Sequence, residues 1–310
     1  MKTILSFLSP TGKRARLSIL IWHRVLQQQD AIFPREMHAA RFDRVLGWLK
    51  QSFNVLPLGE AARRLMAGTL PSRALSITFD DGYEDNHRIA LPLLKKHGLC
   101  ATFFVATGFL DGGIMWNDSV IEIIRRCEPG LLEMEGASFE LSDATSRRLA
   151  IEELIGKIKY LDFDSRQEAV IALAKCANIA LSQGEMMNSD QVRELHQQGM
   201  EIGGHTCWHP ILSKLSSQAA REEIVNGKNM LEEIIGERIA VFAYPNGVPG
   251  RDYTDEHVEF VRSVGFEAAV STAWGANSQK DDIFQLRRFT PWDETRTSLL
   301  LRMGRNLLGR

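Results

Sequence analysis

The sequence predicts an α/β fold, a distorted (β/α) barrel of about seven strands, related to the TIM barrel, with a helical insertion. Three observations support this class. Short apolar runs alternate with amphipathic stretches along most of the chain. The length of 310 residues suits one barrel that carries an insertion. Carboxylate and histidine clusters follow several predicted strands, which is where barrels build their active sites.

The predicted strands are short and rich in apolar or β-branched residues. ATFFVA, at 101–106, is apolar throughout, as expected of a strand buried on both faces. The complete set is 17–22, 54–58, 74–79, 101–106, 200–204, 239–244, 266–271 and 284–289. Their alternation with helices favours a parallel sheet that closes into a barrel.

Helical spacing separates these strands. Residues 42–53 place Val45, Leu46 and Leu49 on one face of a helix. A helix over 86–97 can end at Gly98, and one over 216–236 begins with a serine cap and ends with a glycine.

Residues from about 116 to 189 break the alternation. Helical spacing covers 118–126, 145–161 and 165–181, and we identify no convincing strand there. No low-complexity linker bounds this stretch. We therefore expect one domain over 1–310, with a helical insertion between two barrel strands.

Composition excludes several classes of protein. Hydrophobic residues make up 44% of the chain, which argues against disorder. The 37 Lys and Arg against 39 Asp and Glu leave no basic footprint for nucleic acid. The four cysteines are widely spaced without a Cys-x-x-Cys pair, so neither a disulfide framework nor a zinc cluster is expected.

The N-terminal apolar stretch is interrupted by Lys13, Arg14 and Arg16, so we expect no signal peptide and a cytoplasmic location. No stretch approaches the ~20 apolar residues of a transmembrane helix. Small basic clusters near both ends leave peripheral contact with a membrane surface open: Lys13 to Arg16, and Arg302, Arg305 and Arg310.

Two clusters contain metal-binding or acid–base residue types. Asp80 and Asp81 follow the strand at 74–79, and a turn at Gly82 can direct both carboxylates to one site. His205 and His209 are four residues apart, the spacing of metal-binding pairs on one helical turn. Taken alone, each cluster is also compatible with an ordinary turn or a helix face.

A third cluster, Tyr244-Pro245-Asn246-Gly247, can present backbone N–H groups to an oxyanion, or form an ordinary turn. Together the three clusters favour a function. One carboxylate and two histidines leave a coordination position for water, as in catalytic zinc sites. A second carboxylate supplies a general base. These parts suit metal-assisted hydrolysis of an amide or ester.

The same segments resemble the polysaccharide deacetylase family, also called the NodB-homology fold or carbohydrate esterase family 4. The matching motifs are SITFDDGYEDN, GGHTCWHP and FAYPNG, and ILIWHRV resembles the first strand of a bacterial branch. The resemblance covers about residues 17–110 and 190–292, which leaves the helical insertion outside it. The aspartate and histidine motifs in this order are highly specific together.

The resemblance implies a role for each matching residue. Asp80 resembles the general base, and Arg288, in Leu286-Arg287-Arg288, resembles the residue that orients it. Backbone near Asn246, after Tyr244 and Pro245, resembles the oxyanion donor. The implied ligands of a divalent metal, with zinc as the expected ion, are Asp81, His205 and His209.

Two parts of the family pattern are missing. Ala243 stands about where many members carry an arginine, and no histidine follows His257 to act as the general acid. His23 is either a substitute proton donor or a buried structural residue. Trp116 and Trp208 either form aromatic walls for a sugar ring or pack in the core.

The leading functional hypothesis is a metal-dependent hydrolase that removes an N-acetyl group from an amino sugar. The sugar would belong to a polysaccharide, an oligosaccharide or a lipid-linked glycan precursor. A second hypothesis keeps the chemistry but changes the substrate to a non-sugar amide, cyclic imide or formamide. A third is a carbohydrate-binding protein with impaired catalysis, which the two missing family residues motivate.

Overall fold

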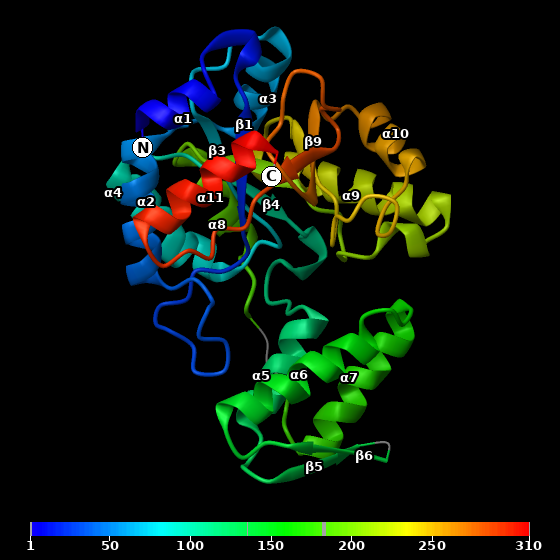
Figure 1. Cartoon of the computed structure of the whole chain (residues 1–310). Coiled ribbons are helices and arrows are strands. Elements are labelled where there is room, and N and C mark those ends of the chain that lie inside the picture. The colour runs from blue at the N-terminus through cyan, green and yellow to red at the C-terminus, as the bar shows by residue number, and fades with distance from the viewer. Residues whose placement is uncertain (1, 135, 182–183, 310) are drawn as a thin grey trace. The chain divides into compact units, whose positions relative to one another are not determined.

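The computed structural model describes residues 2–134, 136–181 and 184–309. Its internal contacts divide the chain into two compact units. Unit 1 comprises Met1–Gln28, Met37–Leu110 and Met187–Arg310, and unit 2 comprises Gln29–Glu36 and Asp111–Met186. Each unit is described by itself below (Figure 1).

Unit 1 is built on a parallel sheet that nearly closes into a barrel, as the sequence predicts. The strands follow the order β1-β3-β4-β7-β8-β9-β10, and β2 pairs with β3 beside this path. Ile21 N donates to Phe289 O at 3.1 Å, and Phe289 N donates to Ile19 O at 2.8 Å, so the residue after β10 bonds to β1. The bounds are β1 (Leu17–Trp22), β2 (Asn54–Val55), β3 (Ala74–Phe79), β4 (Thr102–Val105), β7 (Glu201–Gly204), β8 (Val241–Ala243), β9 (Ala268–Trp274) and β10 (Leu286–Arg288).

Helices surround this sheet within unit 1 (Figure 1). They are α1 (Lys2–Leu8), α2 (Ala39–Ser52), α3 (Leu58–Ala67), α4 (Leu91–His97), α8 (Ser189–Gln197), α9 (Ser217–Ile235), α10 (Asp255–Ser263) and α11 (Arg296–Leu308). Short helical turns add η1 (Gly12–Arg14), η2 (Asn86–Ala90), η3 (Thr107–Phe109) and η4 (Leu212–Lys214). Both ends of helix α9 are as predicted. At its start the Ser216 hydroxyl accepts from Ala219 N, and at its end Gly236 adopts a left-handed conformation.

The barrel core explains why β1 and β3 were predicted to the residue. Every side chain of both strands is buried, so each run is continuously apolar or small. Aromatic rings fill the core next to them. Phe79 stacks on Phe103 with centroids 4.9 Å apart, and Phe42 meets Phe79 edge-on at 5.7 Å.

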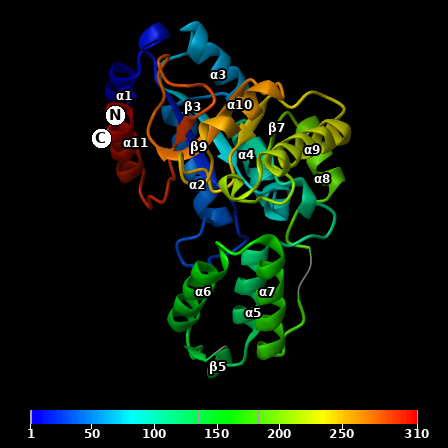
Figure 2. The same cartoon turned by 90° about the vertical axis from the view of Figure 1, so that its right-hand side faces the viewer.

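Unit 2 contains α5 (Trp116–Arg126), α6 (Ala144–Ile158) and α7 (Phe163–Ala177), which Figure 2 shows close together. These are the three predicted helices. The expectation of no strand is wrong, because β5 (Leu131–Met134) and β6 (Ala137–Glu140) form an antiparallel hairpin. The strands have only four residues each, too few for a clear alternation to be recognised. Residues 135, 182 and 183, inside the expected insertion, lie outside the described residues.

Unit 2 buries its own apolar cluster, which includes Ile123, Leu132, Phe139, Ile151 and Leu173. The unit begins at Asp111 and ends at Met186, close to the predicted bounds of 116 and 189, and it also recruits Gln29–Glu36. Its description as an insertion within one domain stays a proposal.

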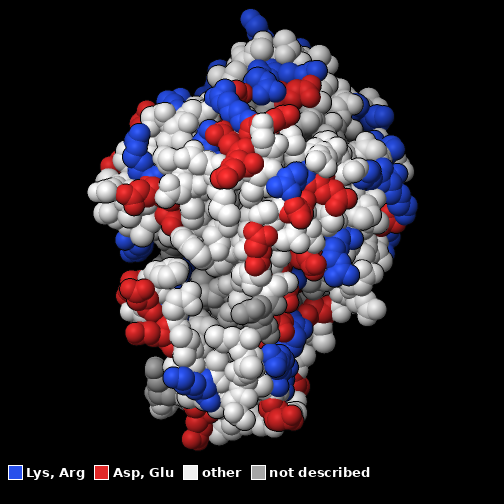
Figure 3. Space-filling view, turned by 180° about the vertical axis from the view of Figure 1, so that it is seen from behind, with Lys and Arg blue, Asp and Glu red and all other residues white. Residues whose placement is uncertain are grey.

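The surface carries mixed charge. On the face in Figure 3, Lys and Arg side chains alternate with Asp and Glu. All four cysteines are free. Among the described residues, none of the helices combines the length and the apolar character needed to cross a bilayer.

The packing of β7 against β4 generates the first testable prediction. A Cβ atom on Gly203 would lie 2.4 Å from Cδ1 of Phe104 and 3.1 Å from Cγ2 of Val241. Gly203→Ala should therefore lower the free energy of unfolding by about 1–3 kcal/mol, the usual cost of overpacking a core. Denaturant unfolding followed by circular dichroism measures this.

Gly47→Ala is the matched control, because its Cβ would lie 3.6 Å from Cε1 of His97, an ordinary contact. Within α2 this change should be neutral or should stabilise by about 1 kcal/mol. Equal effects of the two substitutions would contradict the packing argument.

Candidate active site

The carboxyl end of β3 delivers Asp80 and Asp81 to the same site. Asp80 N still donates to Trp22 O at 2.9 Å, so Asp80 remains in the sheet. Asp81 and Gly82 then both adopt positive φ, at 77° and 92°. This turn directs both carboxylates into the site, although neighbours in a regular strand would point to opposite faces. A positive φ is uncommon for a residue other than glycine and marks stored backbone strain.

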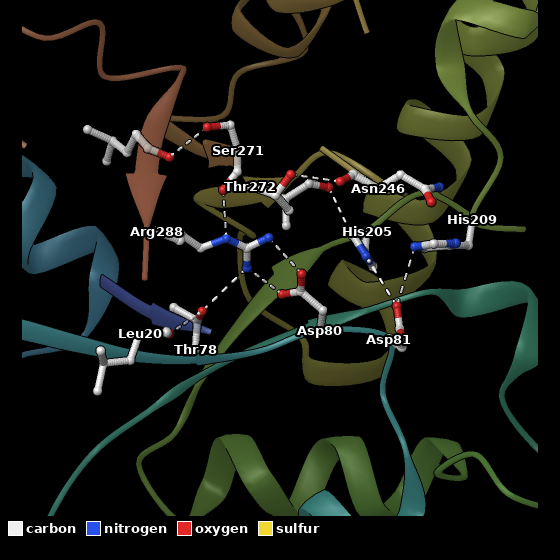
Figure 4. Close-up of polar contacts among 12 residues, drawn as sticks. Leu20, Thr78, Asp80, Asp81, His205, His209, Asn246, Ser271, Thr272 and Arg288 are labelled. Atoms are coloured by element: carbon white, nitrogen blue, oxygen red, sulfur yellow. Dashed lines mark hydrogen bonds and ion pairs between the residues drawn. The ribbon is translucent and has the colours of Figure 1, made fainter. Parts of the chain in front are cut away.

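Arg288 holds Asp80 in a bidentate ion pair. Its Nη1 and Nη2 donate to Oδ1 and Oδ2 of Asp80 at 2.6 and 2.7 Å (Figure 4). The guanidinium is itself fixed, because Nε donates to Ser271 O at 2.9 Å. Side-chain exposure is 1% for Arg288 and 4% for Asp80, so the pair is buried. Such planar two-point pairing fixes orientation as well as charge.

The electrostatics of Asp80 keep its carboxylate ionised. Burial raises the pKa of a carboxyl group, but the charge and hydrogen bonds of Arg288 and the charges of His205 and His23 outweigh it. The pKa of Asp80 therefore lies below its usual value. An ionised carboxylate can accept a proton, which a general base must do.

His205 and His209 lie on a bent loop after β7. The sequence pattern indicated that the two histidines share one helical turn, and this interpretation is wrong. Thr206 and His209 have φ values of 64° and 50°, and this backbone turns both rings toward Asp81. His205 Nδ1 lies 2.7 Å from Ala243 O. Because a carbonyl oxygen only accepts, Nδ1 carries the hydrogen and neutral His205 presents the lone pair of Nε2.

Asp81, His205 and His209 converge on one point. The Nε2 atoms lie 3.3 Å and 3.4 Å from Oδ1 of Asp81 (Figure 4). One ligand atom from each residue falls within 4.8 Å of the others. Oδ1 is buried and has no hydrogen-bond partner among the described residues. A buried anionic oxygen that faces two imidazole lone pairs fits a divalent cation, and this donor set is typical of catalytic zinc.

The pKa directions reflect the same crowding. For Asp81, the effects of His209, His205 and His23 outweigh burial and hold its pKa far below the usual range. Burial lowers the pKa of His209 to about 4. Burial also opposes the charged form of His205, but its close contact with Asp81 and the charges of both carboxylates raise its pKa.

The third motif offers one N–H group to an oxyanion. Tyr244 N donates to Val270 O, Gly247 N donates to Pro245 O, and Pro245 has no N–H. Asn246 remains, with a φ of 57° and its carbonyl held by the Thr272 hydroxyl at 2.8 Å. The ring of Tyr244 is buried and stacks on Tyr253 at 3.8 Å, so the side chain belongs to the core.

His23 follows β1 and is exposed, which removes the alternative of a buried structural histidine. Its backbone carbonyl accepts from Nδ2 of Asn86 at 2.9 Å. His23 directly follows Trp22, whose carbonyl accepts from Asp80 N, so it leaves the sheet at the same end as the two aspartates.

The two tryptophans differ in their surroundings. Trp208 is 46% exposed and meets Phe109 edge-on at 5.4 Å. Trp116 belongs to unit 2, where it packs against the apolar cluster and Arg166 lies 5.4 Å above its ring. Core packing, the second of the two alternatives, therefore describes Trp116, and an exposed aromatic surface describes Trp208.

The sequence analysis missed Glu223 on α9. One oxygen of its half-buried carboxylate accepts from Cys207 N at 3.0 Å and from Trp208 N at 2.9 Å. Gly227, one turn later, allows the helix to approach this loop, because a Cβ there would lie 2.8 Å from the backbone of Thr206. Helix α9 thus supports the loop that carries both histidines. No short sequence motif includes Glu223. The exposed Glu222 beside it has the same side chain, so the sequence alone does not distinguish the two.

Comparison with known proteins agrees with this geometry. The family model for polysaccharide deacetylases matches residues 67–269, well over half of the chain. The chain belongs to this family. The resemblance seen in the sequence motifs is therefore confirmed.

Two relatives illustrate the range of the polysaccharide deacetylase family. YxkH of Bacillus subtilis, named as a candidate polysaccharide deacetylase, is 23% identical over 90% of this chain and 72% of its own length. A poly-β-1,6-N-acetyl-D-glucosamine N-deacetylase of Staphylococcus aureus is 27% identical over 53% of this chain. The match covers 59% of that second protein.

Solved structures show the same fold. The Streptococcus pyogenes deacetylase PplD in complex with acetate aligns with a TM-score of 0.62 at 19% identity, over 93% of this chain and 98% of that chain. IcaB from Ammonifex degensii aligns with a TM-score of 0.59 at 21% identity, over 93% and 97%.

Support of the histidine loop by Glu223 generates a prediction about metal affinity. Glu223→Ala should weaken binding of Zn²⁺ to metal-free protein about 10–100-fold, the usual effect of removing a group that orients metal ligands. Glu223→Gln retains an amide oxygen as acceptor and should lose less. Calorimetric titration of the metal-free protein measures both.

Glu222→Gln is the control, because Glu222 is exposed and bonds only to Gln218 on its own helix among the described residues. The affinity of Glu222→Gln for Zn²⁺ should equal that of the parent. A parental affinity in Glu223→Ala would show that the carboxylate does not position the ligands.

Proposed function

We propose that the protein is a metal-dependent N-deacetylase of an N-acetylated amino sugar in a polysaccharide, oligosaccharide or lipid-linked glycan precursor. The observation that carries this proposal is the pairing of two buried carboxylates with different partners. Asp80 bonds to Arg288, whereas Asp81 faces two imidazoles. Family membership and the name of the Staphylococcus aureus relative support an N-acetylated glycan as the substrate.

Asp81, His205 and His209 would hold the metal, for which we propose zinc. A divalent cation bound there would activate water and polarise the acetamide carbonyl. His205 is prepared for this role, because its Nδ1–H is committed to Ala243 O and its Nε2 faces Asp81. That carbonyl also fixes the ring orientation, as outer partners of metal-binding histidines do.

Asp80 would accept the proton of the attacking water. Arg288 keeps it ionised and holds both oxygens, so its position does not depend on substrate. The N–H of Asn246 would donate to the oxygen that gains charge as water adds to the carbonyl. Acetate and a free amine are the products.

Proton delivery to the leaving amine is assigned to His23. It is exposed, and it follows Trp22, whose carbonyl accepts from Asp80 N, so it leaves the sheet beside the two aspartates. Trp208, exposed beside His209, would offer an aromatic surface to the sugar ring. A cytoplasmic location stays a prediction from the sequence.

Asp80→Asn and His205→Ala test the proposal. Asp80→Asn keeps the shape but removes the base, and should lower kcat by about 10²–10⁴-fold. His205→Ala should also lose metal binding. Acetate release from N-acetylglucosamine oligomers measures activity, with metal content determined in parallel. Removal of metal by a chelator should abolish release, and added Zn²⁺ should restore it.

Asp190→Asn on the exposed surface of α8 is the control and should match the parent. Acetate release at the parent rate by Asp80→Asn, His205→Ala or metal-free protein would overturn the proposal. Hydrolysis of non-sugar amides, cyclic imides or formamides without acetate release from N-acetylated sugars would favour the second hypothesis. Glycan binding without turnover by the metal-loaded parent would favour the third hypothesis, a carbohydrate-binding protein with impaired catalysis.

The role of His23 has a separate signature. His23→Ala should lower kcat for an N-acetyl sugar about 10²-fold or more, because an amine leaves only after protonation. It should barely affect an aryl acetate, because a phenolate leaves without a proton. Rates with the two substrates give the comparison, and equal losses on both would rule out proton donation by His23.

A further inference from the structure

Basic residues concentrate at the two ends of the chain. The first 29 residues contain no Asp or Glu, and none follows Glu294. The whole chain nevertheless has a formal net charge of -2. The Lys and Arg residues in these two stretches are Lys2, Lys13, Arg14, Arg16, Arg24, Arg296, Arg302, Arg305 and Arg310, of which Arg310 lies outside the described residues.

The fold brings the two ends together. Figures 1 and 2 both show α1 beside α11, and Leu5 of α1 is buried in the same cluster as Leu300 and Met303 of α11. Gly304 of α11 faces Leu8, since a Cβ there would lie 3.9 Å from its Cδ1.

Both helices of this pair expose large apolar side chains. Phe7 is 85% exposed and Ile4 56%, and on α11 Leu301 and Leu308 are 55% and 52% exposed. Leu301 and Leu308 are seven residues apart, which places them on one stripe of the helix, with Gly304 between them. We call Ile4, Phe7, Leu301 and Leu308, with the exposed cations Lys2, Lys13, Arg14 and Arg305 of the same two ends of the chain, the α1–α11 surface.

The cations of the α1–α11 surface are available for an external partner. Lys2, Lys13, Arg14 and Arg305 are exposed, and none has an ion-pair partner within the described ranges. By contrast, Arg24 and Arg302 pair with Asp85 and Asp293. Exposed apolar side chains flanked by unpaired cations are the composition of interfacial membrane helices.

We propose that the α1–α11 surface docks on an anionic lipid bilayer. Its apolar side chains enter the boundary between headgroups and acyl chains, and Lys2, Lys13, Arg14 and Arg305 contact lipid phosphates. A lipid surface suits this composition, because exposed apolar side chains enter the acyl boundary while neighbouring cations contact the anionic headgroups. The negative remainder of the chain orients the molecule with this surface toward the membrane.

The α1–α11 surface is separate from the catalytic face. Ser9 O accepts from Arg73 N, and Gly12 N donates to Leu70 O, so the end of α1 and the turn after it lie at the amino ends of β1 and β3. Asp80 and His205 follow the carboxyl ends of their strands. Docking therefore leaves the site accessible, and the inference stands independently of the proposed reaction.

Vesicle co-sedimentation of the full chain tests docking. The parent should sediment with vesicles of phosphatidylcholine mixed with phosphatidylglycerol, but not with phosphatidylcholine alone, and added salt should release it. Phe7→Ser should lower partitioning about tenfold. Lys2→Glu combined with Arg305→Glu should lower it more than tenfold, because each cation near an anionic surface contributes several-fold.

Two controls match these variants. Met230→Ser removes an exposed apolar side chain on α9, and Lys50→Glu with Arg221→Glu changes the net charge equally away from the α1–α11 surface. Both control variants should bind anionic vesicles nearly as well as the parent. All variants should keep the parent's melting temperature and its acetate release from soluble oligomers.

Failure of the parent to bind anionic vesicles, or binding that the Phe7 and charge variants leave unchanged, would overturn the proposal. So would a parent dimer that Phe7→Ser converts to a monomer without any vesicle binding, because a second copy would then be the occupant. Size-exclusion chromatography with light scattering distinguishes that case. Loss of acetate release with intact docking would concern only the proposed reaction.

Discussion

The buried pair between Asp80 and Arg288 depends on barrel closure, and the site depends on the pair. Asp80 follows β3, and Arg288 ends β10. These two strands come together because β1 lies between them: it pairs with β3 on one side and with Phe289, the residue after β10, on the other. Removal of one member would leave a buried charge unpaired, at a cost of about 3–5 kcal/mol. The geometry of a prospective base is thus coupled to the closure of the fold.

Backbone strain is concentrated around the same point. Seven described residues other than glycine have positive φ, and four of them lie in the three motifs: Asp81, Thr206, His209 and Asn246. Each such residue costs of order 1–3 kcal/mol and persists only where its surroundings determine it. Here the parallel strands before each turn, and Glu223 behind the histidine loop, supply that constraint.

The sequence predicted what local patterns encode. Strands β1 and β3 were predicted to the residue because burial on both faces leaves a continuous apolar signal. The candidate ligand set and Arg288 were predicted through the family motifs, since spacing alone indicated a helical turn for two histidines that lie on a loop. Glu223 and the β5–β6 hairpin escaped prediction: one acts through a contact distant in sequence, and the other is too short to show periodicity.

The charges of the site explain why its two carboxylates are not equivalent. Arg288 neutralises Asp80, so that carboxylate needs no further cation. Among the described residues, the ion-pair contacts of Asp81 are both with imidazoles, and His209, with a pKa of about 4, is neutral near pH 7. A proton on His205 would balance the charge of Asp81 but would leave the lone pair of His209 without a partner. A divalent cation would satisfy all three groups at once, and this difference in partners is the physical basis for the proposed division of the adjacent aspartates between base and ligand.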